Sequence, residues 1–228
     1  MSRVAITTAP DRAEAAAAPY RAHGLEPVLL PCVRIAPAAE SVISDIRHQA
    51  AGATWLVATS PRAIAIVWPD GAMPSVPVAA VGSVTARAVT DAGGTVGLVG
   101  SVGAFELAAG LGEGDGTVVF PHAAGTDPGV FNAITSAGWN LFERAVYETM
   151  PVAPPDADVD AVAFASPSSI RGWSMAKPLE GLVIGVIGPT TARALAEYGG
   201  VPDLIAEPPS HQGLATLMAA HLTERVDR

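Results

Sequence analysis

The sequence predicts an α/β protein with two doubly wound, parallel-sheet lobes that arose by internal duplication and are joined by a two-stranded linker. Short apolar runs recur between alanine-rich helical segments, a pattern typical of parallel strands that helices cover on both faces. One segment of the chain also repeats at a fixed spacing. Of the 228 residues 50% are apolar and 15% are charged, which is enough apolar material for two buried cores.

The repeat aligns residues 59–94 with residues 165–200 without a gap, at an offset of 106 residues. Ten of the 36 aligned positions are identical, about twice the number that chance predicts at this composition, which favours duplication. The longest identical string is Thr85-Ala86-Arg87-Ala88, which matches residues 191–194. A weaker similarity pairs residues 4–35 with residues 118–149.

Both copies of the repeat have the same order of elements. An apolar run ends at Ser-Pro, where the serine suits a helix N-cap and the proline suits the first helical position. A second apolar run ends at glycine and hydroxyl residues, and the helix that follows ends at Gly-Gly. Strands of the first lobe are expected near residues 3–7, 26–31, 160–165, 182–187 and 203–206. Strands of the second lobe are expected near residues 55–58, 78–81, 95–99, 117–121 and 141–147.

The order of these strands along the chain makes the first lobe discontinuous. It is expected to comprise residues 1–34 and 152–228, and the second lobe, residues 37–149, is inserted within it. Linkers are expected near residues 33–37 and 149–155, and the second is proline-rich and therefore extended. Two lobes connected by two linkers predict a hinge, with a cleft between the lobes.

Composition and motifs exclude several classes of function. The net charge is −9 and the basic residues are scattered singly, so neither nucleic acid nor an anionic membrane is an expected partner. The single cysteine, Cys32, excludes an intramolecular disulfide and a thiolate-rich metal site. No nucleotide-binding glycine motif and no HExxH metal motif occurs, so no metal is expected. The apolar runs are shorter than a bilayer span and no export signal is recognised, so a cytoplasmic location is expected.

Hydroxyl residues and helix starts follow the predicted strands, at the edge where ligands bind in open parallel sheets. Helix N-termini offer unpaired backbone N–H groups to carboxylates or phosphates, and this requires no net positive charge. In the alternative interpretation these hydroxyls only cap helices. The candidate binding residues are Thr8, Thr59, Ser60, Gly82, Ser83, Thr85, His122, Ser166, Ser168, Gly188, Thr190 and Thr191.

Two further side chains each allow two interpretations. His122 follows a predicted strand and is either an exposed loop residue or a ligand contact. Tyr147 ends the strand before the second linker, so its phenol either reaches the site or packs at the junction. Position alone does not decide between them.

Several strings occur in a characteristic order over nearly the whole chain: Thr59-Ser60-Pro61-Arg62-Ala63, Val146-Tyr147-Glu148-Thr149, Ser166-Pro167-Ser168 and Gly188-Pro189-Thr190-Thr191-Ala192-Arg193-Ala194. In this order they resemble the uroporphyrinogen-III synthase family. The resemblance implies a cofactor-free lyase of porphyrin and heme biosynthesis with two α/β lobes. Its substrate would be hydroxymethylbilane, a linear tetrapyrrole with eight carboxylates, which is cyclised with loss of water and inversion of ring D. By the motif match, Tyr147 would be the catalytic residue that assists departure of the hydroxyl.

The chain departs from the family pattern at two places. Family members often carry an arginine after the first strand, where this chain has Thr7-Thr8-Ala9-Pro10, and a glycine-rich basic loop where it has residues 121–127. Fewer cations imply weaker substrate binding or a low-activity paralogue. The two-lobed hinge with helix N-termini at the cleft leaves a second alternative, a non-catalytic module that binds anions or tetrapyrroles. A flavodoxin-like redox protein is a third. The enzyme is expected to act as a monomer, with transient contact to the upstream bilane-forming enzyme.

Overall fold

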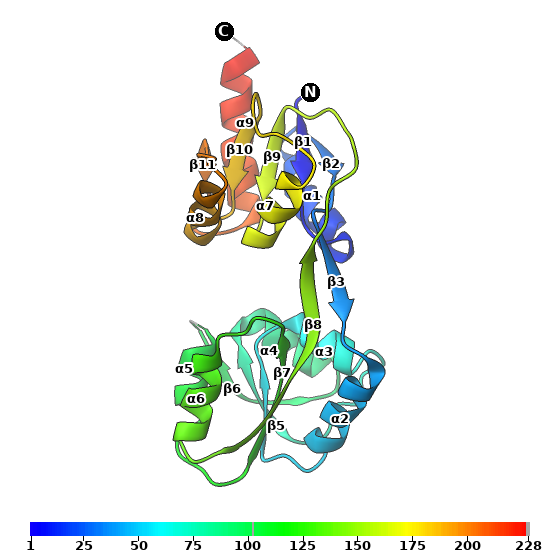
Figure 1. Ribbon diagram of the computed structural model, residues 1–228, viewed down its shortest axis with the longest axis vertical. Helices are drawn as coiled ribbons and strands as arrows, with labels where there is room; N and C mark the ends of the chain where they lie inside the picture. The colour runs from blue at the N-terminus through cyan, green and yellow to red at the C-terminus, as the bar shows by residue number, and fades with distance from the viewer. Residues whose placement is uncertain (102, 227–228) are drawn as a thin grey trace. The chain divides into compact units, whose positions relative to one another are not determined.

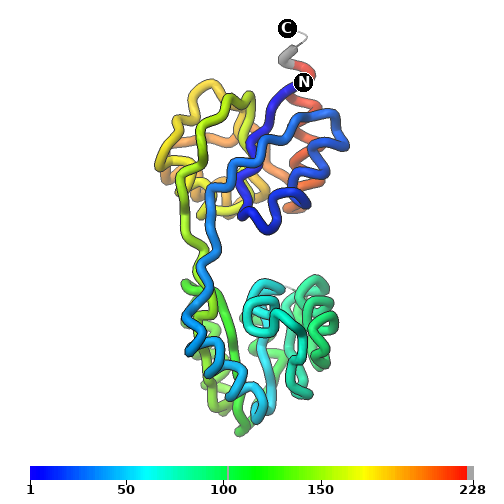
Figure 2. Tube along the Cα trace, turned by 90° about the vertical axis from the view of Figure 1, so that its right-hand side faces the viewer, coloured from blue at the N-terminus to red at the C-terminus, as the bar shows by residue number. Residues whose placement is uncertain are grey.

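The computed structural model describes residues 1–101 and 103–226, and the chain divides into two compact units (Figure 1). Unit 1 consists of residues 1–35 together with the residues from 149 onward, and unit 2 consists of residues 36–148. The blue N-terminal and red C-terminal segments of the trace in Figure 2 therefore belong to the same unit. Within the described residues, no helix is both long and apolar enough to cross a membrane.

Unit 1 is built on a five-stranded sheet with the order β11-β10-β9-β1-β2, in which all neighbours are parallel. Its strands are β1 (Arg3–Ile6), β2 (Glu26–Leu29), β9 (Ala161–Phe164), β10 (Val183–Val186) and β11 (Leu204–Ile205). Its helices are α1 (Pro10–Ala22), α7 (Pro167–Ser174), α8 (Pro189–Glu197) and α9 (His211–Val226).

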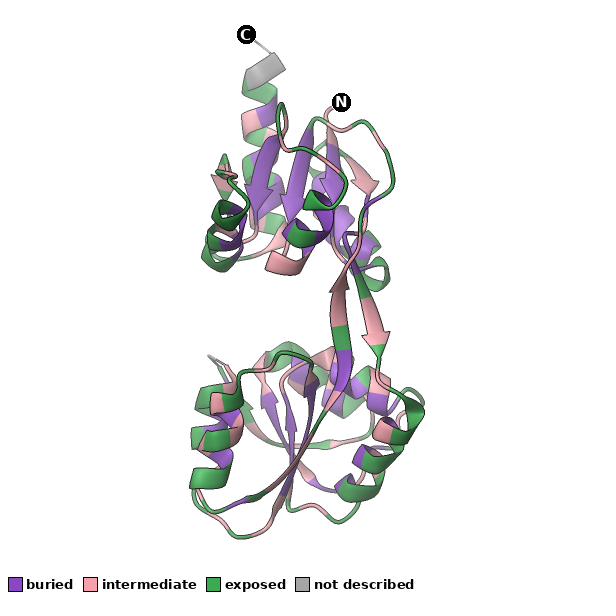
Figure 3. Cartoon of the chain, in the orientation of Figure 1, coloured by how far each residue is buried: buried purple, intermediate pink, exposed green. Residues whose placement is uncertain are grey.

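Helices cover both faces of this sheet, which explains why its strands lack polar alternation. On one face, Val4 and Ala161 pack with residues of α1 and α9. On the other face, Ala5 and Val162 pack with residues of α7 and α8. All four residues of β9 and of β10 are buried, as the purple strands in Figure 3 show. Successive residues of one strand therefore enter two different apolar cores.

Unit 2 is built on a six-stranded sheet with the order β3-β8-β7-β4-β5-β6, parallel from β8 to β6. Its strands are β3 (Val33–Pro37), β4 (Trp55–Ala58), β5 (Pro77–Val81), β6 (Thr95–Gly100), β7 (Thr117–Ala123) and β8 (Asn140–Pro151). Its helices are α2 (Glu40–Ala50), α3 (Pro61–Val67), α4 (Gly82–Asp91), α5 (Ala104–Gly110) and α6 (Pro128–Ser136). Val57, Ala79 and Phe120 of the sheet pack with residues of α5 and α6.

This second sheet has one strand more than the sequence predicts. Residues 33–37, expected only as a linker, form β3 beside β8. β8 continues to Pro151, so the start of the second expected linker is also strand. Val33 and Ile35 are β-branched and suit a strand. Their partner strand lies more than a hundred residues away, and the local pattern does not indicate such a pairing.

The two sheets have equivalent strand orders. β9, β10 and β11 of unit 1 correspond to β4, β5 and β6 of unit 2, as the alignment at an offset of 106 residues requires. β1 and β2 correspond to β7 and β8, in agreement with the weaker similarity between residues 4–35 and 118–149. The strand pair that comes last in unit 2 comes first in unit 1, so the two copies are related by circular permutation.

Candidate functional site

In unit 2, the predicted ligand-binding residues lie at one edge of the sheet. The pairs β4–β5, β4–β7 and β7–β8 are parallel, so the carboxyl ends of these strands meet there. Thr59 and Ser60 follow β4, and Gly82 follows β5. Tyr147 on β8 pairs with Ala123, the last residue of β7. Side chains that lie far apart in the sequence are thus collected at this edge.

Tyr147 is packed and also makes a polar contact. It is 7% exposed, and its phenol O–H donates a hydrogen bond to Ser60 Oγ at 3.2 Å. Ser60 is the N-cap of α3, and its Oγ also accepts the backbone N–H of Arg62 at 3.2 Å. The guanidinium carbon of Arg62 lies 5.9 Å from the centroid of the Tyr147 ring. A serine hydroxyl accepts two hydrogen bonds and donates one, so the Ser60 proton can be donated to the phenol oxygen or to a ligand.

The first turn of α4 offers backbone N–H groups at the same edge. Gly82 begins the helix with φ +72°, a conformation that glycine adopts without strain. The N–H groups of Ser83 and Val84 have no acceptor among the described residues, as is usual for a first helical turn. The Ser83 side chain is exposed, whereas Thr85 is buried at 3% exposure. An anionic group can therefore bind the N–H groups of this turn, while Thr85 packs beneath it.

His122 lies inside β7, and the interpretation of this residue as an exposed loop residue is wrong. Its side chain is 7% exposed, with Nε2 2.6 Å from Glu143 Oε2 and Nδ1 2.8 Å from the Ala123 carbonyl oxygen. The ring also packs against Phe120 and Phe131. Pairing with β8 extends β7 to Ala123, beyond the predicted strand end. Both ring nitrogens face protein oxygens, so ligand contact through His122 stays a prediction.

In unit 1, the predicted residues follow β1, β9 and β10, which are neighbouring strands. Thr8 follows β1, Ser166 follows β9, and Gly188 follows β10. The Thr7 hydroxyl donates a hydrogen bond to the Ala163 carbonyl at 2.7 Å and so joins the ends of β1 and β9. Thr8 Oγ1 is buried without a hydrogen-bond partner among the described residues. A buried hydroxyl of this kind normally has a partner, which a ligand or water can supply.

Helix capping accounts for some of the unit 1 hydroxyls and not for others. Ser166 caps α7 in a reciprocal capping box with Ser169, with both bonds at 3.2 Å. Ser168 and Thr190 lie at the second positions of α7 and α8, and their N–H groups have no acceptor within the described chain. Thr191 is buried at 3% exposure. Ser168 and Thr190 are therefore the residues of this edge that are open to a ligand.

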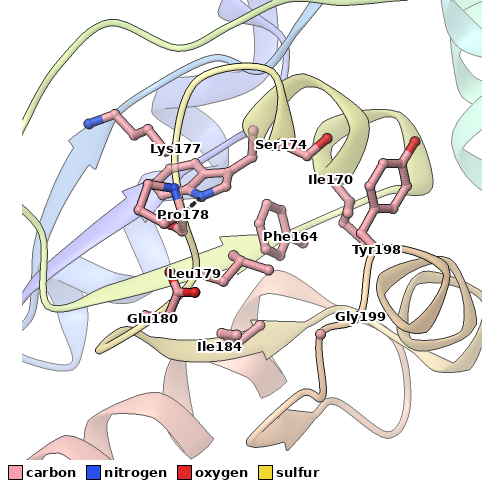
Figure 4. Close-up of a pocket in the computed structure, with 12 residues that line it drawn as sticks. Phe164, Ile170, Ser174, Lys177, Pro178, Leu179, Glu180, Ile184, Tyr198 and Gly199 are labelled. Atoms are coloured by element: carbon pink, nitrogen blue, oxygen red, sulfur yellow. Dashed lines mark hydrogen bonds between the residues drawn. The ribbon is translucent and has the colours of Figure 1, made fainter.

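Two hollows beside α7 and α8 were not predicted from the sequence. The first has a volume of about 430 Å³ and is lined by Phe164, Leu179 and Tyr198, among others (Figure 4). The second, also about 430 Å³, is lined by residues of both helices, including Arg171 and Arg193. Tyr198 contributes to both hollows. Arg193 lies in the repeated string 191–194, which is a signal that the sequence contains. Arg171 lies in no repeated string, so the sequence gives no signal for it.

A buried pair of rings in unit 1 lies outside the predicted site. Tyr20 of α1 and His211 of α9 have ring centroids 6.2 Å apart in an edge arrangement. Tyr20 Oη and His211 Nδ1 are buried without hydrogen-bond partners in the described structure. Burial raises the pKa of Tyr20 and lowers the pKa of His211, because it disfavours the charged form of each group.

Two parallel-sheet units with equivalent strand orders, each with hydroxyls and open N–H groups at its carboxyl edge, define a class of α/β proteins suited to small anionic ligands. The family model described as uroporphyrinogen-III synthase HemD matches residues 14–216. The chain therefore belongs to the uroporphyrinogen-III synthase family, which comprises cyclising hydro-lyases of heme biosynthesis that act on a small-molecule tetrapyrrole. The family predicted from the motifs is confirmed.

Solved structures carry the same fold. A mutant uroporphyrinogen III synthase from the extremely thermophilic bacterium Thermus thermophilus is 22% identical and superposes with a TM-score of 0.68, over 98% of this chain and 100% of that one. The uroporphyrinogen-III synthetase from Helicobacter pylori 26695 is 17% identical, with a TM-score of 0.65 over 97% and 99% of the two chains. A comparison with curated protein sequences gave no significant match. The predicted α/β fold with parallel sheets is thus confirmed.

Proposed function

We propose that this protein is an active uroporphyrinogen-III synthase that cyclises hydroxymethylbilane with loss of water and inversion of ring D. The observation that carries the proposal is the phenol of Tyr147, held by Ser60 Oγ at the carboxyl edge of the unit 2 sheet. It is a proton donor among hydroxyls and backbone N–H groups, with the Arg62 guanidinium near its ring. Such a setting suits a reaction that depends on positioning more than on strong acids and bases.

The carboxylates of the substrate would bind the open first turns of the helices at the two sheet edges. In unit 2 these are the N–H groups of Ser83 and Val84, and in unit 1 those of Ser168 and Thr190. Each oxygen atom of a carboxylate accepts such bonds readily, and the positive end of the helix dipole favours the negative charge. An acidic protein can therefore recognise a polyanionic substrate through local groups, with no need of a positive net charge.

Proton transfer follows from the same geometry. The Tyr147 O–H donates its proton to the hydroxyl of the substrate, which leaves as water and yields a protonated azafulvene, an azafulvenium cation. The phenolate that forms accepts the Ser60 O–H proton in a hydrogen bond. The substituted α-carbon of ring D then attacks, and the spiro intermediate fragments and closes again. Closure releases a proton from ring D, which returns to the phenolate, so that water is the only net loss.

We further propose that the enzyme acts in the cytoplasm as a monomer that receives its substrate by transient contact with the bilane-forming enzyme. Hydroxymethylbilane closes unaided to the type I ring, so a short transfer time favours the type III product. Size-exclusion chromatography with light scattering tests the monomer. To test the contact, the two enzymes are mixed at a fixed ratio of their activities and at increasing total concentration. An increase in the yield of the type III isomer supports the contact.

The decisive experiment supplies hydroxymethylbilane generated enzymatically and resolves the product isomers. Turnover is run anaerobically without added metal or nucleotide, and the products are oxidised to porphyrins and separated by chromatography. We expect the type III isomer. If only type I porphyrin forms while an established synthase yields type III in parallel, the alternative of a non-catalytic binding module replaces the proposal.

A further inference from the structure

The groove between α7 and α8 brings together two cationic side chains that are 22 positions apart in the sequence. Arg171 of α7 and Arg193 of α8 both line it, and its volume is about 430 Å³. Thr190, at the start of α8, lines the same groove and has a backbone N–H without an acceptor in the described structure. A guanidinium group offers five N–H donors in a planar fork that matches a carboxylate.

Neither of these two arginines has an ion-pair partner among the described residues, whereas four other basic residues do. Arg3, Arg21 and Arg47 are paired with glutamates, and Lys177 with Asp156. The chain has a net charge of −9, so acidic groups to neutralise a cation are plentiful. Arg171 and Arg193 line one groove without carboxylate partners in the described part of the chain, so both guanidinium groups are available to an anionic ligand.

The other side chains of the groove limit the kind of ligand it suits. Glu197, the last residue of α8, also lines the groove and carries a negative charge. With the two arginines, the groove therefore has a net charge of one positive unit. Tyr198 lines the groove and also the neighbouring hollow with Phe164 and Leu179, where Figure 4 shows its ring at the margin. An anionic group next to an aromatic surface suits a carboxylate carried on an aromatic ring, as in a pyrrole with acidic side arms.

We propose that this groove is an additional substrate subsite, in which Arg171 and Arg193 bind a carboxylate arm of the tetrapyrrole and Tyr198 contacts its pyrrole ring. The proposal rests on the proposed function and extends it to residues outside the sheet edges. It also supplies cations to a chain that lacks them after β1 and in residues 121–127. Arg171 and Arg193 are thereby positioning residues that hold substrate and do not take part in the chemistry.

Binding can be measured apart from turnover with uroporphyrin III, the stable oxidised product, by titrating its fluorescence. We expect Arg171→Gln and Arg193→Gln each to weaken binding about fivefold, the factor that corresponds to roughly 1 kcal/mol for a partly exposed ion pair. Arg171→Lys and Arg193→Lys should recover part of the loss, because they keep the charge but not the fork. Coproporphyrin III, which has half as many carboxylates, should show a smaller loss.

Arg3→Gln is the matched control. It removes the same charge from the same unit, but Arg3 lies at the amino end of β1 and pairs with Glu26. We expect it to bind uroporphyrin III like the wild type at low and at high salt. The difference between the groove variants and the control should shrink in 0.5 M NaCl, because salt screens exposed ion pairs.

Two outcomes separate this proposal from the proposed function. If the wild type makes the type III isomer but the groove variants bind uroporphyrin III as tightly as Arg3→Gln, the subsite is refuted and the enzyme assignment stands. If the wild type makes only type I but the groove variants still lose affinity, the groove binds tetrapyrrole carboxylates and the enzyme assignment fails. Circular dichroism spectra show whether each variant is folded. If a Gln variant is unfolded, the Lys variant at the same position still tests the groove.

Discussion

Tyr147→Phe separates the proposed catalytic role of the phenol from its part in folding. The substitution removes one hydrogen bond, the 3.2 Å bond to Ser60 Oγ, and leaves the buried ring in place. Ser60 Oγ keeps its bond from the Arg62 N–H, so no buried acceptor is left without a donor. The loss of unfolding free energy should be about 1 kcal/mol, a shift of roughly 2–4 °C in Tm for a chain of this size.

The expected loss of activity is much larger than this loss of stability. General acid catalysis by one side chain contributes about 10²–10⁴-fold, and the lower end applies here because the pyrrole itself drives loss of the hydroxyl. A hundredfold fall in kcat corresponds to about 2.7 kcal/mol of activation free energy. KM should change little, because the carboxylates bind other groups. The type III isomer should remain the product, because ring placement does not depend on the phenol.

A double-mutant cycle tests whether Ser60 acts through Tyr147. Ser60→Ala should lower kcat in the wild-type background and have little further effect in Tyr147→Phe, because the two groups form one hydrogen-bonded unit. Asp127→Ala is the control for the lost helix cap. Asp127 caps α6 in the same unit through a 2.8 Å bond from the Gly129 N–H, so its loss costs a similar amount of stability, about 1 kcal/mol.

The assay follows single-turnover formation of uroporphyrin III anaerobically, with thermal unfolding measured on the same samples. A Phe variant that is fully active would refute the role of the phenol. A variant that loses activity only in proportion to its folded fraction would do so too. Additive effects of Ser60→Ala and Tyr147→Phe would show that Ser60 acts through helix capping alone.

Three further changes have expected outcomes. Gly188→Val should lower turnover about tenfold and cost about 1 kcal/mol of stability, because valine is a poor N-cap and its Cβ would lie 3.1 Å from Pro209 Cγ at the start of α8; kinetics and calorimetry check this. Gly172→Ala should destabilise the fold by about 3 kcal/mol or more in urea unfolding, because the new Cβ would overlap the Cys32 carbonyl, and unchanged stability would contradict the packing described. The folded-state pKa of His211 lies below its ordinary 6.5, so the unfolded state binds more protons and unfolding free energy should fall as pH drops below about 6.5; this dependence should weaken in His211→Gln.

The fold was predictable because its signals are local. Ser-Pro at the starts of α3 and α7, and Gly-Gly after α4 and α8, mark element ends wherever they occur. The burial of β9 and β10 on both faces leaves a continuous apolar run in the sequence. The local sequence predicts residues 33–37 as a linker segment and does not show their pairing with β8, because that contact joins segments remote in the chain.

The candidate site was less predictable, because its contacts join distant residues. Ser60 and Tyr147 are 87 positions apart, and only the order of strands in the sheet brings them within 3.2 Å. The sequence does not show that His122 lies in a strand, because only the pairing of β7 with β8 carries the strand past Pro121. Arg171 and Arg193 share a groove only because α7 packs beside α8. Each of these results requires the tertiary fold.

The position of β1 between β2 and β9 affects the order in which the chain can fold as it is synthesised. One neighbour of β1 is β2, but the other is β9, whose residues emerge from the ribosome about 157 residues later. The β4–β7 segment of unit 2 is contiguous and can assemble first. Until β9 has been synthesised, the edge of β1 that pairs with β9 has no strand partner in the synthesised part of the chain. In a circularly permuted gene that begins at residue 149 and joins the original termini, unit 1 would be contiguous. Fewer residues would then separate the synthesis of β1 from that of β9.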